Sequence, residues 1–394
     1  MSGLLSAGLI VALAVGAAEP ADNTIFPPDA VLEPLFTSPL DLGGGLSEGP
    51  AAAPDGSIYF TVIPFGPRSK LQTHIQRYDP KTGNVSLFTD HGSKANGMVF
   101  DAAGNLIVCD GADGGRREVS RWNVETGERQ SLASRIGGKR LNSPNDLCLD
   151  RQGRIYFTDP RYVNGDPMEL PYKAVYVIDP GSTDPNEAAR EWTHDVETPN
   201  GIVLSPDEHT IYVGDHHTPP RPAKGKPGAK PAATAAADRT AAADRTAAAD
   251  HGAMRVYAFP IDENGRIAGP RRTLVERGDE EICDGLTVDS AGNLYITCRN
   301  PAKPGILVVD EDGQELAFLP TGPVDQEPKS KHLVGIPSNV EFGVGDDRHT
   351  LYVTIDQGFY YVRTQQAGAL RAWEATNPDA SKPDTSKSDN KTSD

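Results

Sequence analysis

The stretch NDLCLDRQGRIYF, at residues 145–157, decides the fold because its pattern recurs along the chain. It consists of a lead-in that begins at Asn145, a turn at Gly153 and a short apolar strand around Tyr156. The turn and strand occur six times, as GSIYF, GNLIV, GRIYF, HTIYV, GNLYI and HTLYV, and equivalent residues are 48, 49, 56, 83 and 57 positions apart. Apart from the interval of 83, this is the spacing of propeller blades with four strands each. The sequence therefore predicts an all-β, six-bladed β-propeller.

The long interval contains low-complexity sequence rather than a further blade. Residues 218–252 are rich in Pro, Lys and Ala, repeat RTAAAD and have almost nothing apolar to bury. We expect a disordered loop insertion there, inside a propeller domain that spans 30–365. The polar residues 377–394 are expected to form a disordered tail.

The N-terminus has the pattern of a secretory signal. Leu4–Val15 is apolar and is followed by the small residues Gly16–Ala18, which predicts a signal peptide at 1–18 and a periplasmic or secreted protein. A buried core helix is the alternative. No other segment approaches the ~20 apolar residues of a membrane span, so no membrane contact is expected after signal removal. The net charge of −17 argues against a nucleic-acid partner.

Each of the six lead-ins begins with a side chain that carries an oxygen. These residues are Glu48, Asn96, Asn145, Asn200, Asp284 and Asn339. Four of them lie eight residues before the turn glycine, whereas Asn200 and Asn339 lie nine and ten residues before longer turns. If the lead-ins are the innermost strands, all six side chains point at the propeller axis on one face. The alternative, that Asn and Asp are turn formers at strand entry, does not explain six matches out of six.

A ring of carboxylates and amide oxygens favours a hard divalent cation. Ca²⁺ accepts six to eight such ligands with loose geometry, which makes it the first choice, and Mg²⁺, Mn²⁺ and Zn²⁺ stay open. One such cation could polarise a carbonyl oxygen, and a neighbouring carboxylate could take a proton from water. Those parts suit hydrolysis of an activated ester. We do not expect a serine nucleophile.

Four stretches carry a family resemblance: SEGP at Ser47–Pro50, NSPNDLCLDRQGRIYFTDPRY at Asn142–Tyr162, TPNGIVLSPDEHTIYVGDHH at Thr198–His217 and CDGLTVDSAGNLYIT at Cys283–Thr297. The chain resembles the family of gluconolactonase, regucalcin (senescence marker protein) and related lactonases from about Leu35 to Arg363, apart from the insertion. The resemblance implies one divalent cation bound by Glu48, Asn145, Asn200 and Asp284. It also implies that Asp284 is the general base.

The same resemblance implies hydrolysis of a sugar lactone, such as gluconolactone, to the aldonic acid. Asn96 and Asn339 are then expected to line the pocket. Asn142 is a candidate to bind sugar hydroxyls, and Asp159, at the end of its hairpin, is a candidate for substrate contact. The first repeat departs from the family because it lacks an aromatic residue after EGP and an Asp after the strand. This departure leaves the shape of the substrate open.

Two other functions stay open on the sequence alone. The same metal propeller could hydrolyse another ester, such as an aryl ester or an organophosphate. It could also be a non-catalytic, exported calcium- or sugar-binding protein, although a carboxylate at the position of the family's base favours the enzyme. The oligomeric state is not indicated.

The end of the fifth repeat raises two further questions. Arg299 could bind an acidic group of a substrate, but we expect a surface ion pair instead. Cys283 and Cys298 are equally far from their hairpin turn and could face each other. A disulfide and two buried thiols are both consistent with that placement.

Overall fold

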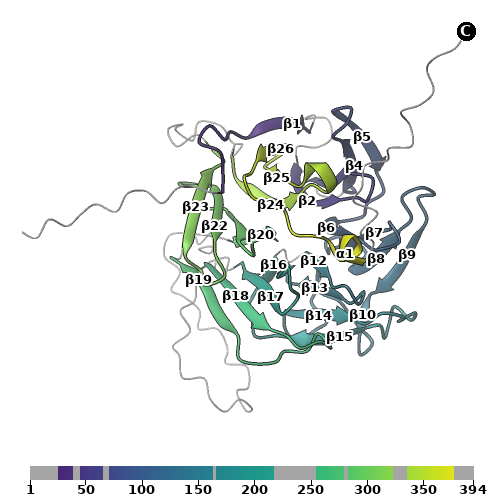
Figure 1. Ribbon diagram of the computed structural model, residues 1–394. Helices are drawn as coiled ribbons and strands as arrows, with labels where there is room; N and C mark the ends of the chain where they lie inside the picture. The colour runs from purple at the N-terminus through teal and green to yellow at the C-terminus, as the bar shows by residue number, and fades with distance from the viewer. Residues whose placement is uncertain are drawn as a thin grey trace, which may run out of the picture.

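The structure is a computed structural model that describes residues 25–38, 45–64, 71–162, 166–216, 254–278, 283–322 and 335–376. Six antiparallel sheets of four strands surround a central axis (Figure 1), which confirms the predicted six-bladed β-propeller. The predicted signal peptide at 1–18, the insertion at 218–252 and the tail at 377–394 lie outside the described residues. Among the described residues, no helix is both long and apolar enough for a membrane span.

The blades follow one another along the chain, each from its innermost to its outermost strand. The first two are β2 (Gly45–Ala52), β3 (Ile58–Pro64), β4 (His74–Asp79), β5 (Asn84–Thr89), then β6 (Ala95–Phe100), β7 (Leu106–Asp110), β8 (Glu118–Trp122), β9 (Arg129–Ala133). The third and fourth are β12 (Leu147–Leu149), β13 (Ile155–Asp159), β14 (Ala174–Ile178), β15 (Ala189–Thr193), then β16 (Pro199–Leu204), β17 (Thr210–Asp215), β18 (Met254–Pro260), β19 (Arg272–Arg277). The fifth is β20 (Cys283–Val288), β21 (Leu294–Cys298), β22 (Gly305–Val309), β23 (Glu315–Pro320).

The sixth blade closes the ring with both ends of the chain. Its strands are β24 (Pro337–Phe342), β25 (Thr350–Ile355), β26 (Gly358–Arg363) and, outermost, β1 (Glu33–Thr37). A short β10–β11 ribbon (Arg135–Ile136 and Lys139–Arg140) and the 3-10 helix η3 (Gly345–Asp347) complete the connections. The C-terminal repeat supplies the three inner strands of this blade, and the N-terminal strand β1 completes it by pairing with β26.

Aromatic side chains of the second strands tie neighbouring blades together. Phe60 stacks on Phe359 of the sixth blade with ring centroids 4.3 Å apart, and Tyr59 meets Phe100 of the second blade edge-on at 5.2 Å. These rings are almost completely buried. Such pairs add about 0.5–1.5 kcal/mol each beyond their buried area, so they hold adjacent blades at a fixed angle.

The six innermost strands neighbour one another around the axis and run in the same direction, because every blade repeats the same strand order. Their first residues gather at one end of the central channel, which we call the ring end. Their last residues gather at the other end, which we call the closed end. Any set of side chains at the start of these strands therefore converges, and this convergence creates the candidate site.

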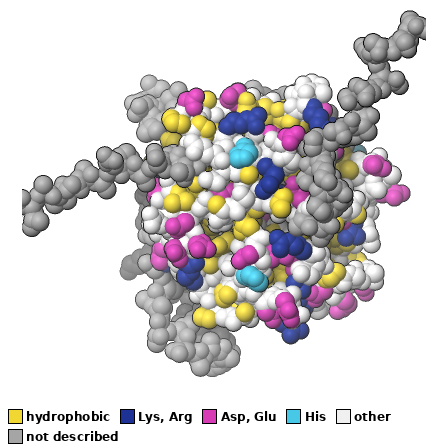
Figure 2. Space-filling view, in the orientation of Figure 1, with side chains coloured by type: hydrophobic (Ala, Val, Ile, Leu, Met, Phe, Trp, Pro, Cys, Tyr) yellow, Lys and Arg dark blue, Asp and Glu magenta, His cyan; other side chains and the backbone are white. Residues whose placement is uncertain are grey.

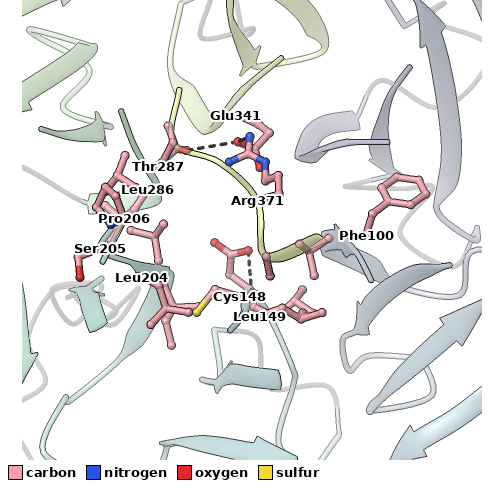
Figure 3. Close-up of a pocket in the computed structure, with 18 of the residues that line it drawn as sticks. Phe100, Cys148, Leu149, Leu204, Ser205, Pro206, Leu286, Thr287, Glu341 and Arg371 are labelled. Atoms are coloured by element: carbon pink, nitrogen blue, oxygen red, sulfur yellow. Dashed lines mark hydrogen bonds and ion pairs between the residues drawn. The ribbon is translucent and has the colours of Figure 1, made fainter. Parts of the chain in front are cut away.

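The C-terminal segment covers the closed end. After β26 the chain crosses the axis and forms the short helix α1 (Ala372–Thr376), with Trp373 buried. Arg371 pairs with Glu341, and its guanidinium donates to the carbonyl of Phe342 at 2.8 Å. A cavity of about 100 Å³ remains under this segment. Figure 3 shows Glu341 and Arg371 on one side of it and Cys148 on the other.

The molecular surface carries charges of both signs. On the face shown in Figure 2, acidic, basic and apolar side chains are interspersed, and no broad basic patch is visible on that face.

Candidate functional site at the ring end

The innermost strands of the second, fourth and fifth blades each have a β-bulge at the ring end. The register shifts after Ala95, after Pro199 and after Cys283, so that two residues oppose one residue of the second strand. The first residue of each bulge is Asn96, Asn200 or Asp284. A bulge re-aims a side chain out of the regular pleat. These three predicted residues therefore occupy equivalent positions, as the repeat indicated.

A glycine follows most ring residues because neighbouring strands approach very closely here. The N–H of Gly97 donates to the carbonyl of Asn145 in the next blade at 2.7 Å. A Cβ on Gly201 would lie 2.3 Å from the carbonyl oxygen of Asp284, and one on Gly49 would lie 2.1 Å from that of Asn96. The dipeptides EG, NG and DG are thus packing requirements of the channel. They fix the position of each ring residue relative to the next blade.

The sixth blade corrects the prediction for Asn339. The register pairs Pro337 with Ile355 and Asn339 with Thr354, so the extra residue of the bulge is Ser338. Ser338 therefore stands at the ring position, and its hydroxyl donates to the carbonyl of Ser47 at 2.6 Å. Asn339 lies one residue further along the channel. The longer turn before the second strand hides this shift when residues are counted backwards from it.

Asn339 and Asp146 occupy the position that glycine takes in the other blades. Each side chain caps the next backbone N–H, with Oδ1 of Asp146 accepting from Leu147 at 2.9 Å and that of Asn339 accepting from Val340 at 2.8 Å. Both also line the cavity toward the closed end. Burial raises the pKa of Asp146 to about 7, and the nearby Asp284 adds to that rise. They form a second polar layer below the ring.

Two carboxylates and one guanidinium dominate the charge at the ring end. Burial and the charge of Asp284 raise the pKa of Glu48 well above its usual range, and Arg299 opposes this rise. Arg299 donates from Nη1 to Oδ2 of Asp284 at 2.5 Å. The prediction that Arg299 forms a surface ion pair is therefore wrong in its location, because its partner is a residue of the predicted site.

Tyr162 and His216 flank the ring residues, and the sequence assigned them no firm role. Burial of its hydroxyl end and the nearby Asp284 raise the pKa of Tyr162 well above its usual range, and a hydrogen bond with Asn200 opposes this. Tyr162 is 37% exposed as a whole residue, and its aromatic ring meets that of His216 edge-on with centroids 5.0 Å apart. Nδ1 of His216 lies 2.7 Å from the carbonyl oxygen of Cys283. Burial lowers the pKa of His216, which favours the neutral imidazole at the site.

Asn142 and Asp159 take part in the structure of the third blade's entry loop, and their contact with substrate stays a prediction. Neither side chain is exposed. The carboxylate of Asp159 accepts from the N–H groups of Asn142 at 2.7 Å and Ser143 at 2.6 Å. The side-chain amide of Asn142 donates to the carbonyl of Tyr172 at 2.9 Å. Together they hold the loop that leads into Asn145.

The same device recurs in two other blades. Oδ1 of Asp215 accepts from the N–H of Thr198 at 2.9 Å, just before Asn200. Oδ2 of Asp356 accepts from the N–H of Gly335 at 2.5 Å, just before the sixth blade's innermost strand. An aspartate at the end of the second strand thus anchors the entry loop of the first strand.

Asp110, at the corresponding place in the second blade, makes no such loop contact within the described part of the chain. Its carboxylate is completely buried, with the hydroxyl of Ser120 at 3.4 Å and Nη1 of Arg116 at 3.7 Å. Burial raises its pKa to about 7; Arg116 and Arg129 oppose the rise and Glu118 adds to it. The folded protein therefore binds a proton here more tightly than the unfolded chain does.

We expect Asp110→Asn to stabilise the protein at pH 8 and to have little effect at pH 4. A carboxyl whose pKa rises on folding contributes stability below its unfolded pKa, near 4, and loses that contribution as the pH rises toward 7. A rise from about 4 to about 7 corresponds to an upper limit of roughly 4 kcal/mol. Urea unfolding at both pH values measures the difference, with the exposed Asp90→Asn as control. Equal gains at both pH values would contradict this explanation.

Cys283 and Cys298 are direct partners in the β20–β21 ladder, as their spacing suggested. Neither is in a disulfide; both are buried thiols, and burial raises the pKa of Cys283 well above its usual range. The structure therefore favours the second of the two states that the sequence left open. A protonated thiol beside Asp284 adds no charge to the site.

The side chains at the ring end fit a hard cation in their chemistry. The predicted set of Glu48, Asn145, Asn200 and Asp284 offers two carboxylates and two amides, all nearly buried. No group of three or more His, Cys, Asp or Glu suited to a metal occurs among the described residues. A cation here would take its remaining oxygens from amides. Two close carboxylates, one with a strongly raised pKa, are the arrangement that a divalent cation relieves.

Comparison with known proteins establishes the family. The model of the SMP-30/gluconolactonase/LRE-like region matches residues 46–220 and 243–357, which is more than half of the chain. The chain belongs to this family. A gluconolactonase of Zymomonas mobilis is 28% identical over 294 residues, covering 71% of this chain and 65% of that protein. The lactonohydrolase oryL of Aspergillus oryzae is 26% identical over 205 residues, covering 50% of this chain and 41% of that protein. The chain thus spans less than two thirds of the length of these relatives.

Solved structures of the family share the fold. A gluconolactonase of Xanthomonas campestris superposes with a TM-score of 0.61 and 25% identity, covering 86% of this chain and 90% of that one. A calcium-binding regucalcin of Agrobacterium tumefaciens superposes with a TM-score of 0.58 and 14% identity, covering 87% of this chain and 96% of that one. Membership of the SMP-30/gluconolactonase family and the six-bladed fold therefore agree with the sequence-based expectation.

Proposed function

We propose that this member of the SMP-30/gluconolactonase family is a divalent-metal-dependent lactonase that opens a sugar lactone of the gluconolactone type to the aldonic acid. The observation that carries the proposal is the convergence of Glu48 and Asp284 in one nearly buried site, where burial and the charge of Asp284 raise the pKa of Glu48. The names of the gluconolactonase and lactonohydrolase relatives support the reaction class.

One divalent cation, Ca²⁺ in the first place, is proposed to be held by Glu48, Asn145, Asn200 and Asp284. The calcium-binding regucalcin among the structural neighbours supports this choice. When bound, the cation would polarise the lactone carbonyl and lower the pKa of an attacking water.

The protein's own residues account for the remaining steps. Asp284 is proposed to take the proton of the water that attacks the carbonyl carbon. The C–O bond of the lactone ring then breaks, and the departing oxygen takes up the proton that Asp284 received and becomes a hydroxyl of the aldonic acid. Asn96, half-buried at the second blade's ring position, and Tyr162 are proposed to contact substrate hydroxyls. Asn339 is proposed to contribute only from deeper in the channel.

A substrate panel tests the reaction class. Acid release is followed with a pH indicator for glucono-1,5-lactone, a five-membered sugar lactone and an aryl ester, using Ca²⁺-loaded protein without residues 1–18. We expect turnover of the sugar lactones well above spontaneous hydrolysis and little of the aryl ester. Faster turnover of the aryl ester would replace the substrate class. If no ester is hydrolysed although Ca²⁺ is bound, the protein is a binding protein rather than an enzyme.

The proposed signal peptide at 1–18 implies export. Detection of a chain that lacks these residues in a periplasmic or secreted fraction tests this proposal.

A further inference from the structure

Arg299 reaches from the second strand of the fifth blade to the first. It follows Cys298, the ladder partner of Cys283, so its guanidinium lies opposite Asp284. Nη1 of Arg299 is 2.5 Å from Oδ2 of Asp284, and the two side chains are 21% and 9% exposed. The pair is therefore poorly screened by water and salt, unlike an ion pair on the outer surface.

Three charged groups share this part of the channel. The charges of Asp284 and Glu48 raise the pKa of Arg299, and the charge of Asp356 adds to this rise. Burial by itself would lower the pKa of Arg299, but these carboxylates more than offset it, so the guanidinium stays charged. One positive group thus compensates part of the charge of two buried carboxylates.

A divalent cation and this guanidinium need the same carboxylate. Asp284 accepts the hydrogen bond of Arg299 and is also in the proposed ligand set. Two positive groups held within a few ångströms of each other in a shielded site repel strongly. The cation can therefore bind Asp284 fully only if Arg299 withdraws from it.

We propose that Arg299 is a built-in competitor of the divalent cation, which neutralises Asp284 in the cation-free protein and lowers the affinity for the cation. The inference rests on the metal-binding part of the proposed function. It gives Arg299 two opposite effects: it stabilises the cation-free fold, and it weakens cation binding.

Arg299→Gln tests the proposal because it removes the charge and keeps a hydrogen-bonding side chain. Ca²⁺ titration calorimetry should show a Kd at least tenfold lower than in the wild type. The Tm without Ca²⁺ should fall, and the rise in Tm on adding Ca²⁺ should be larger than in the wild type. Arg299→Lys keeps the charge and should stay close to the wild-type Kd.

Arg277→Gln is the matched control. Arg277 is similarly covered, at 24% exposure, and its guanidinium lies 2.6 Å from Glu315. This pair joins the outermost strands β19 and β23, away from the channel, so its loss should leave the Kd unchanged. Unchanged or weaker Ca²⁺ binding by Arg299→Gln would overturn the inference and would make Arg299 a positioning residue for Asp284. Absence of Ca²⁺ binding in the wild type and every variant would overturn the metal site as well.

Discussion

Asp284→Asn is expected to lower kcat/KM for the lactone by about 10²–10⁴-fold, the range for loss of a general base. The substitution preserves the size of the side chain at a position that is 6% exposed, so the blade should keep its packing. It removes the proposed base and one of the two charges of the ring. The cation affinity should fall at the same time, because an amide replaces a carboxylate.

Kinetics and Ca²⁺ calorimetry on the same protein separate the two effects. At saturating Ca²⁺ the loss in kcat should persist, since binding the cation again does not restore a base. Asp312→Asn, an exposed turn residue of the same blade, serves as control and should behave as the wild type does. An Asp284→Asn protein with wild-type kcat/KM would exclude Asp284 as the base.

Gly49→Ala is expected to lower the free energy of unfolding by about 3 kcal/mol or more. Gly49 has φ +48°, which costs an L-residue about 1–2 kcal/mol. Its new Cβ would also lie 2.1 Å from the carbonyl oxygen of Asn96 and 2.8 Å from Cα of Gly97, so the backbone of the next blade must shift. Overpacking of this kind costs about 1–3 kcal/mol in addition. Because Glu48 precedes Gly49, Ca²⁺ binding should weaken as well.

Gly83→Ala is the control that introduces the backbone strain of a positive φ without the steric clash expected at Gly49. Gly83 lies in the β4–β5 turn of the same blade with φ +72°, and a Cβ there meets nothing within 4 Å. Urea unfolding should therefore show a loss of only about 1–2 kcal/mol. Equal losses in the two variants would mean that the close approach of β2 and β6 does not constrain the ring.

The hairpin repeat was sufficient to predict six blades, because each copy carries its own turn and buried strand. It also located Asn96, Asn200 and Asp284, since the distance from turn to bulge is the same or nearly the same in those blades. It was insufficient for the sixth blade. There the turn before the second strand is longer, and no local signal in the sequence distinguishes Ser338 from Asn339.

Contacts between distant segments could not be predicted from the pattern. Glu33–Thr37 has no copy in the repeat, so its pairing with β26 was not visible. The burial of Asp159 depends on the loop that it anchors, and the ion pair of Arg299 depends on the direction of its side chain. The EG, NG and DG dipeptides did indicate close packing, because a side chain in place of each glycine would overlap with atoms of the next blade.

The proposed lactone hydrolysis requires a bound divalent cation, and this requirement can be measured. Protein without residues 1–18 is treated with a chelator, and acid release from glucono-1,5-lactone is measured before and after addition of Ca²⁺, Mg²⁺, Mn²⁺ or Zn²⁺. We expect chelation to abolish turnover, and at least one cation, Ca²⁺ first, to restore it in the wild type but not in Asp284→Asn. Full turnover in the chelated protein would contradict this requirement.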